Sequence, residues 1–488
     1  MRRCIPAAWL LLLLLVPAIA WVAGARQPLL EDRSKEPFPA VNTASLQQPS
    51  TFAQFDTAFL DRFPARDKAL QLHADIALDL FRDSTSPDVA LGHNGYLYYL
   101  RELSPCTDYA PTGDPGDAVD VLSRELIATG RRPVVVLPRA KVFVHDADIP
   151  ALDDSNKRCD ARLEEGIEQR LATTPGGLAM FAQQRALEQA GKATFLKTDT
   201  HWNWRGRELF ARDVLNRIRP GLADEVGLQV GAPYGRDTDL TAMLGRPRTE
   251  EDLSVGATRT PREALQHVLL IGDSQLTETF LVPRGPFQPI RDVALPGSQY
   301  CDWGTVATSA CDDAITSSKT IVIEKVARDM KVVTDTCWLP LALTAGPLRG
   351  TPASWERVDG GTPAQSTSLV LPASGEVTVR VRSNAADAEP TPRLLRLPLE
   401  HVTPAPDNTP GAVALAQEPQ EGPPAPCASP QQSGNGNALF LPVPANRRVS
   451  DLVIRLTGPP GTVMGAPQEI LLDGRPVAGD VATGRANH

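Results

Sequence analysis

A serine that follows a short apolar strand segment is the first residue of this chain whose type and position suggest chemistry. Residues 268–271 read Val-Leu-Leu-Ile, which is typical of a strand buried in a parallel sheet, and Gly272-Asp273-Ser274 follows directly. Open α/β sheets bind ligands beyond the carboxyl ends of their strands, where backbone N–H groups can hold an oxyanion. Ser274 is therefore a candidate nucleophile, and its alternative role at this position is that of a helix N-cap.

A serine hydroxyl needs a general base, and the base needs a partner that orients it. The segment from Thr198 to Trp202 follows the apolar residues 193–196 and contains Asp199 and His201. Residues i and i+2 of an extended segment point to the same side, so the Asp199 carboxylate can fix the tautomer of the His201 imidazole. Together the residues predict a Ser-His-Asp set, with Ser274 as nucleophile, His201 as base and Asp199 as the orienting group.

Two other interpretations of Asp199 and His201 stay open at this point, a surface ion pair and a fragment of a metal site. Too few further ligands stand nearby at metal-site spacing, so we expect neither a metal nor another cofactor. His145 stands beside Asp146 and Asp148 and is the nearest rival base, which we interpret as part of a solvated loop.

The elements that must position these residues alternate between helix and strand. Such alternation, with short apolar strands, predicts an α/β fold with a doubly wound parallel sheet. The helical segments are residues 51–82 (split at Pro64), 117–129, 178–191 and 206–218, and the strand segments are residues 97–100, 133–138, 193–196, 268–271 and 320–324.

Beyond Cys337 the composition changes and strand patterns replace helices. We expect a hairpin over residues 366–381 that turns at Ser374-Gly375, and a small antiparallel β-sandwich overall. The Pro/Gly-rich residues 403–436 predict a disordered insertion. Further strands are expected at residues 393–399, 439–443, 451–456 and 469–472.

The sequence as a whole predicts four parts. They are a signal peptide at 1–25, a mobile leader at 26–50, the α/β domain at 51–338 and the β-sandwich at 339–488.

Composition narrows the class of protein. A chain of 488 residues has room for two or three domains, and a net charge of −9 argues against nucleic-acid binding. An acidic polymer would have to be held by a local basic groove. Apart from Cys4 the chain has six cysteines, which suggests three disulfides in an oxidising compartment, with 15 possible pairings. We predict Cys301–Cys311 as a local loop and Cys337–Cys427 as a clamp on the C-terminal region.

The N-terminus has the features of a targeting segment. Arg2 and Arg3 precede an apolar run over residues 7–22, and Ala23-Gly24-Ala25 is a cleavage site of small residues. The prediction is a periplasmic or secreted protein. The alternative is that residues 7–22 stay uncleaved as an anchor in the inner membrane, although they are fewer than the ~20 residues that a spanning helix usually needs.

The motifs together resemble the alginate O-acetyltransferase family of AlgX and AlgJ, whose members carry an SGNH-hydrolase-like domain. The most specific match joins residues 197–203 (Lys-Thr-Asp-Thr-His-Trp-Asn) to Gly272-Asp273-Ser274, and its Asp-x-His element precedes the serine, a permuted order relative to ordinary SGNH esterases. The resemblance spans roughly residues 51–335 in the same order. Four further blocks match less specifically. They are residues 61–67, residues 92–98, residues 134–141 together with Ile149-Pro150, and residues 321–328.

The resemblance implies transfer of acetyl groups to hydroxyls of an exopolysaccharide, alginate or a similar polymer, through an acetyl-serine. It implies Ser274 as nucleophile, with its backbone N–H as an oxyanion donor, and Lys141 and Arg328 as structural or substrate contacts. Trp202 is a further candidate substrate contact. A membrane-bound acetyl donor and export-complex proteins are the implied partners.

The C-terminal region resembles the carbohydrate-binding β-domain of AlgX, but it has few aromatic residues to stack on sugars, with Trp338 and Trp355 as the candidates. Two other functions remain open. The protein could pass the acetyl group to water, as a polysaccharide acetylesterase, or it could be a catalytically inactive polysaccharide-binding assembly factor.

Overall fold

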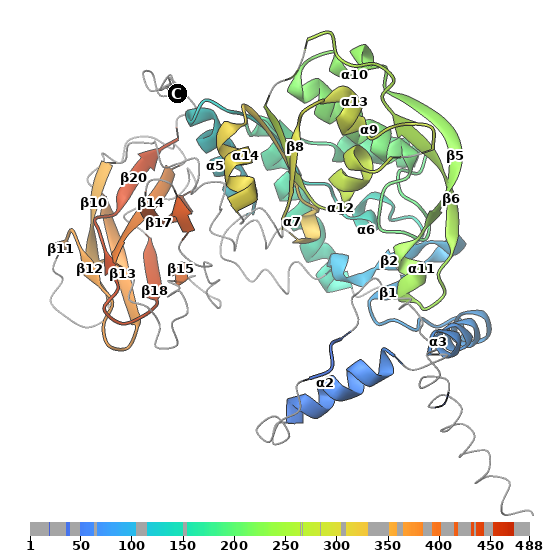
Figure 1. Ribbon diagram of the computed structural model, residues 1–488, viewed down its shortest axis with the longest axis horizontal. Coiled ribbons are helices and arrows are strands. Elements are labelled where there is room, and N and C mark those ends of the chain that lie inside the picture. Colours follow the sequence, from blue (N-terminus) through green and yellow to red (C-terminus); the bar gives the residue numbers. More distant parts are fainter. Residues whose placement is uncertain are drawn as a thin grey trace, which may run out of the picture.

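The computed structural model describes an α/β part followed by an antiparallel β part (Figure 1). The described residues are 19, 36–39, 49–62, 66–103, 115–149, 154–329 (without 264, 266, 284 and 304–308), 351–358, 365–383, 393–401, 414–417, 431–433, 436–443 and 452–472. None of the helices in these ranges is long and apolar enough to cross a membrane. The predicted targeting segment, Ile19 apart, lies outside them.

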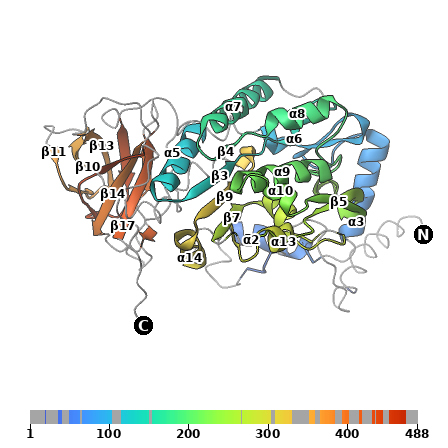
Figure 2. The ribbon, with the colours of Figure 1, turned by 90° about the horizontal axis from the view of Figure 1, so that it is seen from above.

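The centre of the α/β part is a parallel sheet, which in the described residues has five strands in the order β4-β3-β9-β7-β8. Helices lie on both of its faces (Figure 2). The predicted strands at 133–138, 268–271 and 320–324 are its three central members. The strands are β3 (Arg132–Val136), β4 (Gly177–Leu178), β7 (Val268–Gly272), β8 (Gln299–Asp302) and β9 (Thr320–Glu324).

The side chains of the central strands alternate between two cores. Val135 and Leu269 belong to the core on one face, whereas their neighbours Val134 and Leu270 belong to the core on the other. This double burial explains why the strand sequences are apolar throughout, and it confirms the predicted doubly wound fold. The first core includes α5 (Pro115–Ala128), α7 (Asp154–Thr173) and α14 (Ser309–Ser317), and the second includes α9 (Trp204–Ile218), α10 (Leu222–Glu225) and α13 (Ile290–Ala294).

One of the predicted strands differs from the prediction. Residues 193–196 do not join the sheet and make a single antiparallel bridge, between Phe195 and Trp202. The strand predicted at residues 97–100 is present as β2 (Leu97–Tyr99), which pairs with β1 (Val89–Leu91) as a small antiparallel ribbon outside the main sheet. A short apolar run in the sequence does not tell whether the segment joins the main sheet or pairs only locally. The predicted helices at 117–129, 178–191 and 206–218 correspond to α5, α8 (Phe181–Gln189) and α9.

The predicted N-terminal helices form, and they break around Pro64 as expected. They are α2 (Pro49–Leu60) and α3 (Arg66–Asp75), which continues into the π-helix η2 (Ile76–Phe81). Their predicted apolar face is not buried, because Phe52 and Phe55 are 59% and 47% exposed. The spacing of the apolar residues therefore predicted the helices correctly, but it gave no sign that their apolar face is not buried.

A long antiparallel ribbon, β5 (Gln229–Asp237) with β6 (Thr249–Gly256), was not predicted. It contains glycines, a proline and charged residues in place of an apolar alternation, so its sequence lacks the usual strand signal. Between its strands lies the short helix α11 (Asp239–Met243), which reaches the functional site.

In the C-terminal part every described strand pair is antiparallel, and the strands share one core that includes Trp355, Val379 and Leu395. The main strand path is β12-β19-β14-β20-β10-β13-β18-β15. The strands are β10 (Thr351–Arg357), β11 (Gln365–Ser366), β12 (Leu369–Val370), β13 (Glu376–Ser383), β14 (Arg393–His401), β15 (Ala414–Gln417), β16 (Gln431–Ser433), β17 (Gly436–Val443), β18 (Val453–Thr457), β19 (Val463–Met464) and β20 (Gln468–Leu471).

Three expectations for this part need correction. The hairpin at 366–381 does not form, because β12 pairs with β19 while β13 pairs with β10 and β18. The insertion at 403–436 contains strands β15 and β16. Trp355 is 1% exposed and donates a hydrogen bond to the carbonyl of Gly465, so it belongs to the core and has no face for a sugar. Trp338 lies outside the described residues.

The predicted Cys301–Cys311 disulfide is present and joins β8 to α14, with the Cα atoms 6.2 Å apart. Cys159 is also disulfide-bonded. The predicted Cys337–Cys427 pair lies outside the described residues.

We expect replacement of both Cys301 and Cys311 by alanine to lower the free energy of unfolding by roughly 2–3 kcal/mol, because the cross-link restricts the unfolded chain. Urea denaturation of both proteins measures this, first without and then with a reducing agent. The difference between the proteins is expected to shrink under reducing conditions. A difference of unchanged size there would assign the effect to lost packing.

Candidate active site

Asp199 and His201 form a hydrogen-bonded pair in the loop that follows Phe195. Asp199 Oδ1 accepts hydrogen bonds from the backbone N–H of His201 at 2.8 Å and from its ring Nδ1 at 2.6 Å. A proton on Nδ1 leaves the lone pair on Nε2, which is the atom that a general base uses. Nε2 is buried and has no hydrogen-bond partner among the described residues. The pair thus has the orientation that the i, i+2 spacing predicted.

The Asp199 carboxylate is itself buried and has further partners. Its Oδ2 lies 3.5 Å from Nε of Arg236 and 3.3 Å from the backbone N–H of Asp239. Burial alone would raise the pKa of Asp199, but the hydrogen bonds and charge of His201 and the Arg236 guanidinium hold this pKa below its usual range. Asp199 is therefore ionised at neutral pH and can stabilise a protonated His201.

Arg236 and Asp239 are functional-site residues that the sequence did not reveal. Arg236 is the next-to-last residue of β5, is 6% exposed, and its Nη1 lies 3.0 Å from Oε2 of Glu278. Asp239 begins α11 and accepts a hydrogen bond from the backbone N–H of Thr200 at 2.9 Å and another from the Thr200 hydroxyl. Neither residue belongs to a motif, and only the folding of the β5–β6 ribbon brings them to the loop of His201.

Asp239 is a second carboxylate beside the imidazole. Its Oδ2 lies 3.6 Å from His201 Nδ1. Burial and the negative charge of Asp199 raise the pKa of Asp239. One ligand atom each from Asp199, His201 and Asp239 lies within 4.8 Å of the others, which is a spacing that a metal ion could use. In this structure, however, His201 Nδ1 and Asp199 Oδ1 are hydrogen-bonded to each other. This is the arrangement of a histidine base that a carboxylate orients.

Lys141, a candidate contact that the sequence resemblance implied, is 1% exposed and supports the loop that carries Asp199 and His201. Its Nζ donates to the carbonyl oxygens of Leu97 at 2.8 Å, Lys197 at 2.8 Å and Asp199 at 3.1 Å. Three donors and three convergent acceptors match the geometry of an ammonium group. Lys141 is thus a structural contact and lies out of reach of a substrate. Burial lowers its pKa to about 8, although the charges of Glu102 and Asp199 oppose that change.

Ser274 lies where β7 turns into the short helix α12 (Ser274–Leu276), and its side chain is exposed. The N-cap of α12 is Asp273, whose Oδ1 accepts from the backbone N–H of Gln275 at 3.0 Å, so Ser274 is not used as the cap. Asp273 Oδ2 also bonds the end of the neighbouring strand, at Lys325 Nζ (3.3 Å) and the N–H of Val326 (3.2 Å). The turn that carries Ser274 is thereby fastened to β9.

One hydrogen bond links the serine turn to the histidine loop. Nε2 of the Gln275 side chain donates to the carbonyl oxygen of Thr200 at 3.3 Å. No hydrogen bond joins Ser274 Oγ to His201 Nε2 in the described structure. Such contacts are often open in the absence of substrate and tighten when it binds.

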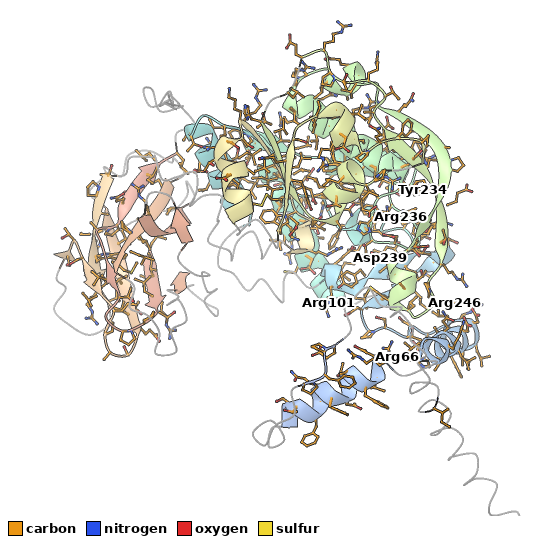
Figure 3. All side chains as sticks on the ribbon, viewed as in Figure 1. Arg66, Arg101, Tyr234, Arg236, Asp239 and Arg246 are labelled. Atoms are coloured by element: carbon orange, nitrogen blue, oxygen red, sulfur yellow. A yellow bond between two sulfur atoms is a disulfide. The ribbon has the colours of Figure 1, made fainter. Side chains whose placement is uncertain are left out.

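A cavity of about 930 Å³ opens beside His201. Asp199, His201 and Arg328 line it, whereas Ser274 does not. Figure 3 shows Arg236 and Asp239 beside the β5–β6 ribbon and α11. The lining residues are Ser86, Tyr99, Asp199, Thr200, His201, Gly235, Arg236, Asp237, Thr238, Asp239, Ala242, Met243, Glu278 and Arg328.

Trp202 and His145 differ from their predicted roles. Trp202 is 0% exposed and packs against Phe210 with ring centroids 4.8 Å apart, so it is a core residue and not a substrate contact. His145 is not solvated: its Nδ1 lies 2.7 Å from Glu188 and its Nε2 2.9 Å from Asp148. Burial opposes protonation of His145, but these two carboxylates raise its pKa above the usual value. With both ring nitrogens bonded, His145 offers no free base.

We expect Lys141→Met to lower the free energy of unfolding by roughly 2–3 kcal/mol at pH 7, because it removes the ammonium donor that three carbonyl groups share, two of them in buried hydrogen bonds. Lys197→Met is the matched control, since the exposed Lys197 ammonium makes one hydrogen bond of 3.4 Å, to Asn94. Urea denaturation measures both. Equal losses in the two variants would contradict a structural role for Lys141.

The same comparison has a pH dependence. Because the pKa of Lys141 is about 8 in the folded protein and 10.5 ordinarily, the unfolded chain binds the extra proton between these values. The free energy of unfolding of the wild type, relative to Lys141→Met, is therefore expected to rise from pH 8 to pH 10. A fall over this range would show that the folded protein retains the proton.

The comparisons with known proteins concern the segment that holds these residues. Residues 89–282 match the family model of the SGNH hydrolase-like domain of the acetyltransferase AlgX. A curated relative, the probable alginate O-acetylase AlgJ of Pseudomonas fluorescens, is 26% identical over 168 residues. That match covers 33% of this chain and 41% of the relative's own length.

Two solved structures share low similarity with the chain. The O-acetyltransferase domain of Pseudomonas putida AlgJ has a TM-score of 0.36 and 18% identity, and the match covers 50% of this chain and 92% of that one. Pseudomonas aeruginosa AlgX has a TM-score of 0.36 and 12% identity, with 78% and 94% covered.

Asp199, His201 and Ser274 all lie within the matched segment. Residues 89–282 of this chain are therefore similar to the SGNH hydrolase-like domain of AlgX, and the chain spans less than half the length of the curated relative AlgJ.

Proposed function

We propose that the protein is an O-acetyltransferase that moves acetyl groups onto hydroxyls of a polysaccharide through an acetyl-serine at Ser274. The observation that carries the proposal is the buried Asp199–His201 pair, whose 2.6 Å hydrogen bond leaves Nε2 of His201 as the available base. The family match and the Gln275–Thr200 hydrogen bond, which ties the serine turn to the same loop, support it.

In the first half-reaction Ser274 Oγ attacks the acetyl carbonyl carbon while His201 Nε2 takes the hydroxyl proton. The tetrahedral oxyanion accepts a hydrogen bond from the backbone N–H of Ser274, which stands in the first turn of α12 and lacks an intrahelical acceptor. The donor's leaving oxygen then takes the proton from His201. Asp199 stabilises the imidazolium that exists between these two proton transfers.

In the second half-reaction a sugar hydroxyl gives its proton to His201 and attacks the acetyl-serine. The carbonyl–Oγ bond breaks, and Ser274 recovers its proton from His201. A polysaccharide acetylesterase would use water in place of the sugar. The cavity beside His201, at about 930 Å³, is far larger than an acetyl group requires, and this space favours a sugar as the acceptor.

The proposal extends to the protein's surroundings. A protein with the predicted signal segment works in the periplasm or outside the cell, where acetyl-CoA is absent. We therefore propose that a membrane-bound partner supplies the acetyl group and that the protein works with polysaccharide-export proteins.

Ser274→Ala is expected to lower acetyl transfer by at least about 10³-fold, because no other group can form the acetyl-enzyme. The purified protein is incubated with a chromogenic acetyl ester and oligosaccharides, and mass spectrometry detects both acetylated Ser274 and acetylated sugar. Ser86→Ala is the control, since it removes a hydroxyl from the cavity lining without touching the proposed mechanism. Undiminished transfer by Ser274→Ala would refute the acetyl-serine. Acetyl-Ser274 with unmodified sugar would indicate the esterase.

Asp199→Asn is expected to reduce transfer by about 10³–10⁴-fold, because an amide at this position favours the wrong tautomer of His201 and cannot stabilise its charged form. The initial rate of ester cleavage measures the loss. Asp237→Asn removes the same charge from the cavity at a residue that does not bond His201, so its ester cleavage is expected to stay within a few-fold of wild type. Similar losses in both variants would mean that general cavity charge, and not orientation of His201, is the cause.

A further inference from the structure

The cavity beside His201 is lined by more acidic than basic side chains. Its described lining has four carboxylates against two guanidinium groups. The acidic residues are Asp199, Asp237, Asp239 and Glu278, and the basic residues are Arg236 and Arg328. This balance matters for the proposed function because each sugar of an alginate chain carries a carboxylate of its own.

Both arginines of the lining already lie beside carboxylates of the protein. Arg236 lies between Glu278, at 3.0 Å, and Asp199, at 3.5 Å. Arg328 lies 3.1 Å from the buried Glu102 and above the ring of Tyr99, 5.3 Å from its centroid. Both positive charges are thus compensated within the protein. By contrast, in the described structure neither Asp237 nor Asp239 has a lysine or arginine partner.

Two further arginines near this region are also paired with carboxylates. Arg101 is 3.3 Å from Asp88, and Arg246 is 2.8 Å from both Asp75 and Asp79. Figure 3 shows Arg246 on the side of α11 that faces α3. The net charge of −9 adds no attraction for an anionic polymer. The local basic groove that an acidic polymer requires is therefore not formed by these side chains.

The lining is well suited to an uncharged sugar. Carboxylate oxygens such as those of Asp237 and Asp239 accept hydrogen bonds from sugar hydroxyls. Tyr99, Ala242 and Met243 add apolar surface for the C–H groups of a sugar ring. A uronate at the same place would instead put its carboxylate beside those of Asp237 and Asp239, which have no lysine or arginine partner in the described structure.

We infer that the acceptor sugar bound beside His201 is electrically neutral, so that the polysaccharide acetylated by this protein is a neutral glycan and not a polyuronate. The inference rests on the proposed acetyl transfer and specifies its acceptor.

The test compares two acceptors that differ only in charge, an oligomannuronate and its methyl ester, with a neutral β-1,4-linked manno-oligosaccharide of the same length as a third. The purified protein receives a chromogenic acetyl ester as donor, and acetylated product is quantified by mass spectrometry at low salt. We expect the methyl ester to be acetylated at least about tenfold faster than the acid, and added salt to reduce this ratio because the repulsion is screened.

The outcomes separate this inference from the proposed function. Equal or faster acetylation of the acid form would overturn the inference and leave the transferase intact. Acetyl-Ser274 that transfers to none of the three glycans would also overturn it. Absence of acetyl-Ser274 would refute the proposed function itself.

A pair of charge variants tests the cause. Asp237→Asn removes a carboxylate from the cavity and is expected to reduce the ester-to-acid ratio by about threefold or more. Asp224→Asn removes the same charge from the exposed end of α10 and is expected to leave the ratio unchanged. Equal ratios in Asp237→Asn and the wild type would overturn the assignment of selectivity to the cavity charge.

Discussion

The buried charge of Asp199 is the constraint on which the rest of the site depends. An ionised carboxylate with so little access to water is costly unless hydrogen bonds and opposite charges surround it. Here the backbone and ring of His201, the backbone of Asp239 and the Arg236 guanidinium provide them. These partners come from two separate parts of the chain. The same carboxylate that orients His201 thus also connects the β5–β6 ribbon to the loop of His201.

A second buried acid supports the serine. Glu324 ends β9, and its Oε2 accepts the backbone N–H of Asp273 at 2.9 Å. Burial, with the charge of Asp273 beside it, raises the pKa of Glu324 well above its usual value. Gly272 must be a glycine here, because a Cβ would lie 2.7 Å from the Leu276 side chain and 2.9 Å from Glu324 Oε2. The sharp turn into Ser274 therefore depends on close packing at the ends of two adjacent strands.

The sequence predicted those parts of the site that depend on local pattern. Apolar runs identified the three central strands, and the i, i+2 spacing identified the Asp199–His201 pair. Burial of individual polar or aromatic residues has no such signal. Lys141 was therefore predicted only as a structural or a substrate contact, and Trp202 as a substrate contact, although both are enclosed. Arg236 and Asp239 could not be predicted, because their contact with the loop needs a ribbon whose sequence lacks alternation. The errors thus lie where tertiary contacts, and not local propensity, decide the role of a residue.

The two halves of the site are held in different ways. The histidine loop is anchored by the buried Lys141 and Asp199, each with three or more hydrogen bonds or ion pairs. The serine turn opens a helix of three residues that passes at once into the π-helix η5 (Thr277–Leu281). So short a helix has little stability of its own. The position of Ser274 therefore depends on Asp273, which caps this helix and bonds the end of β9, and on the Gln275–Thr200 hydrogen bond, which links the serine turn to the loop of His201.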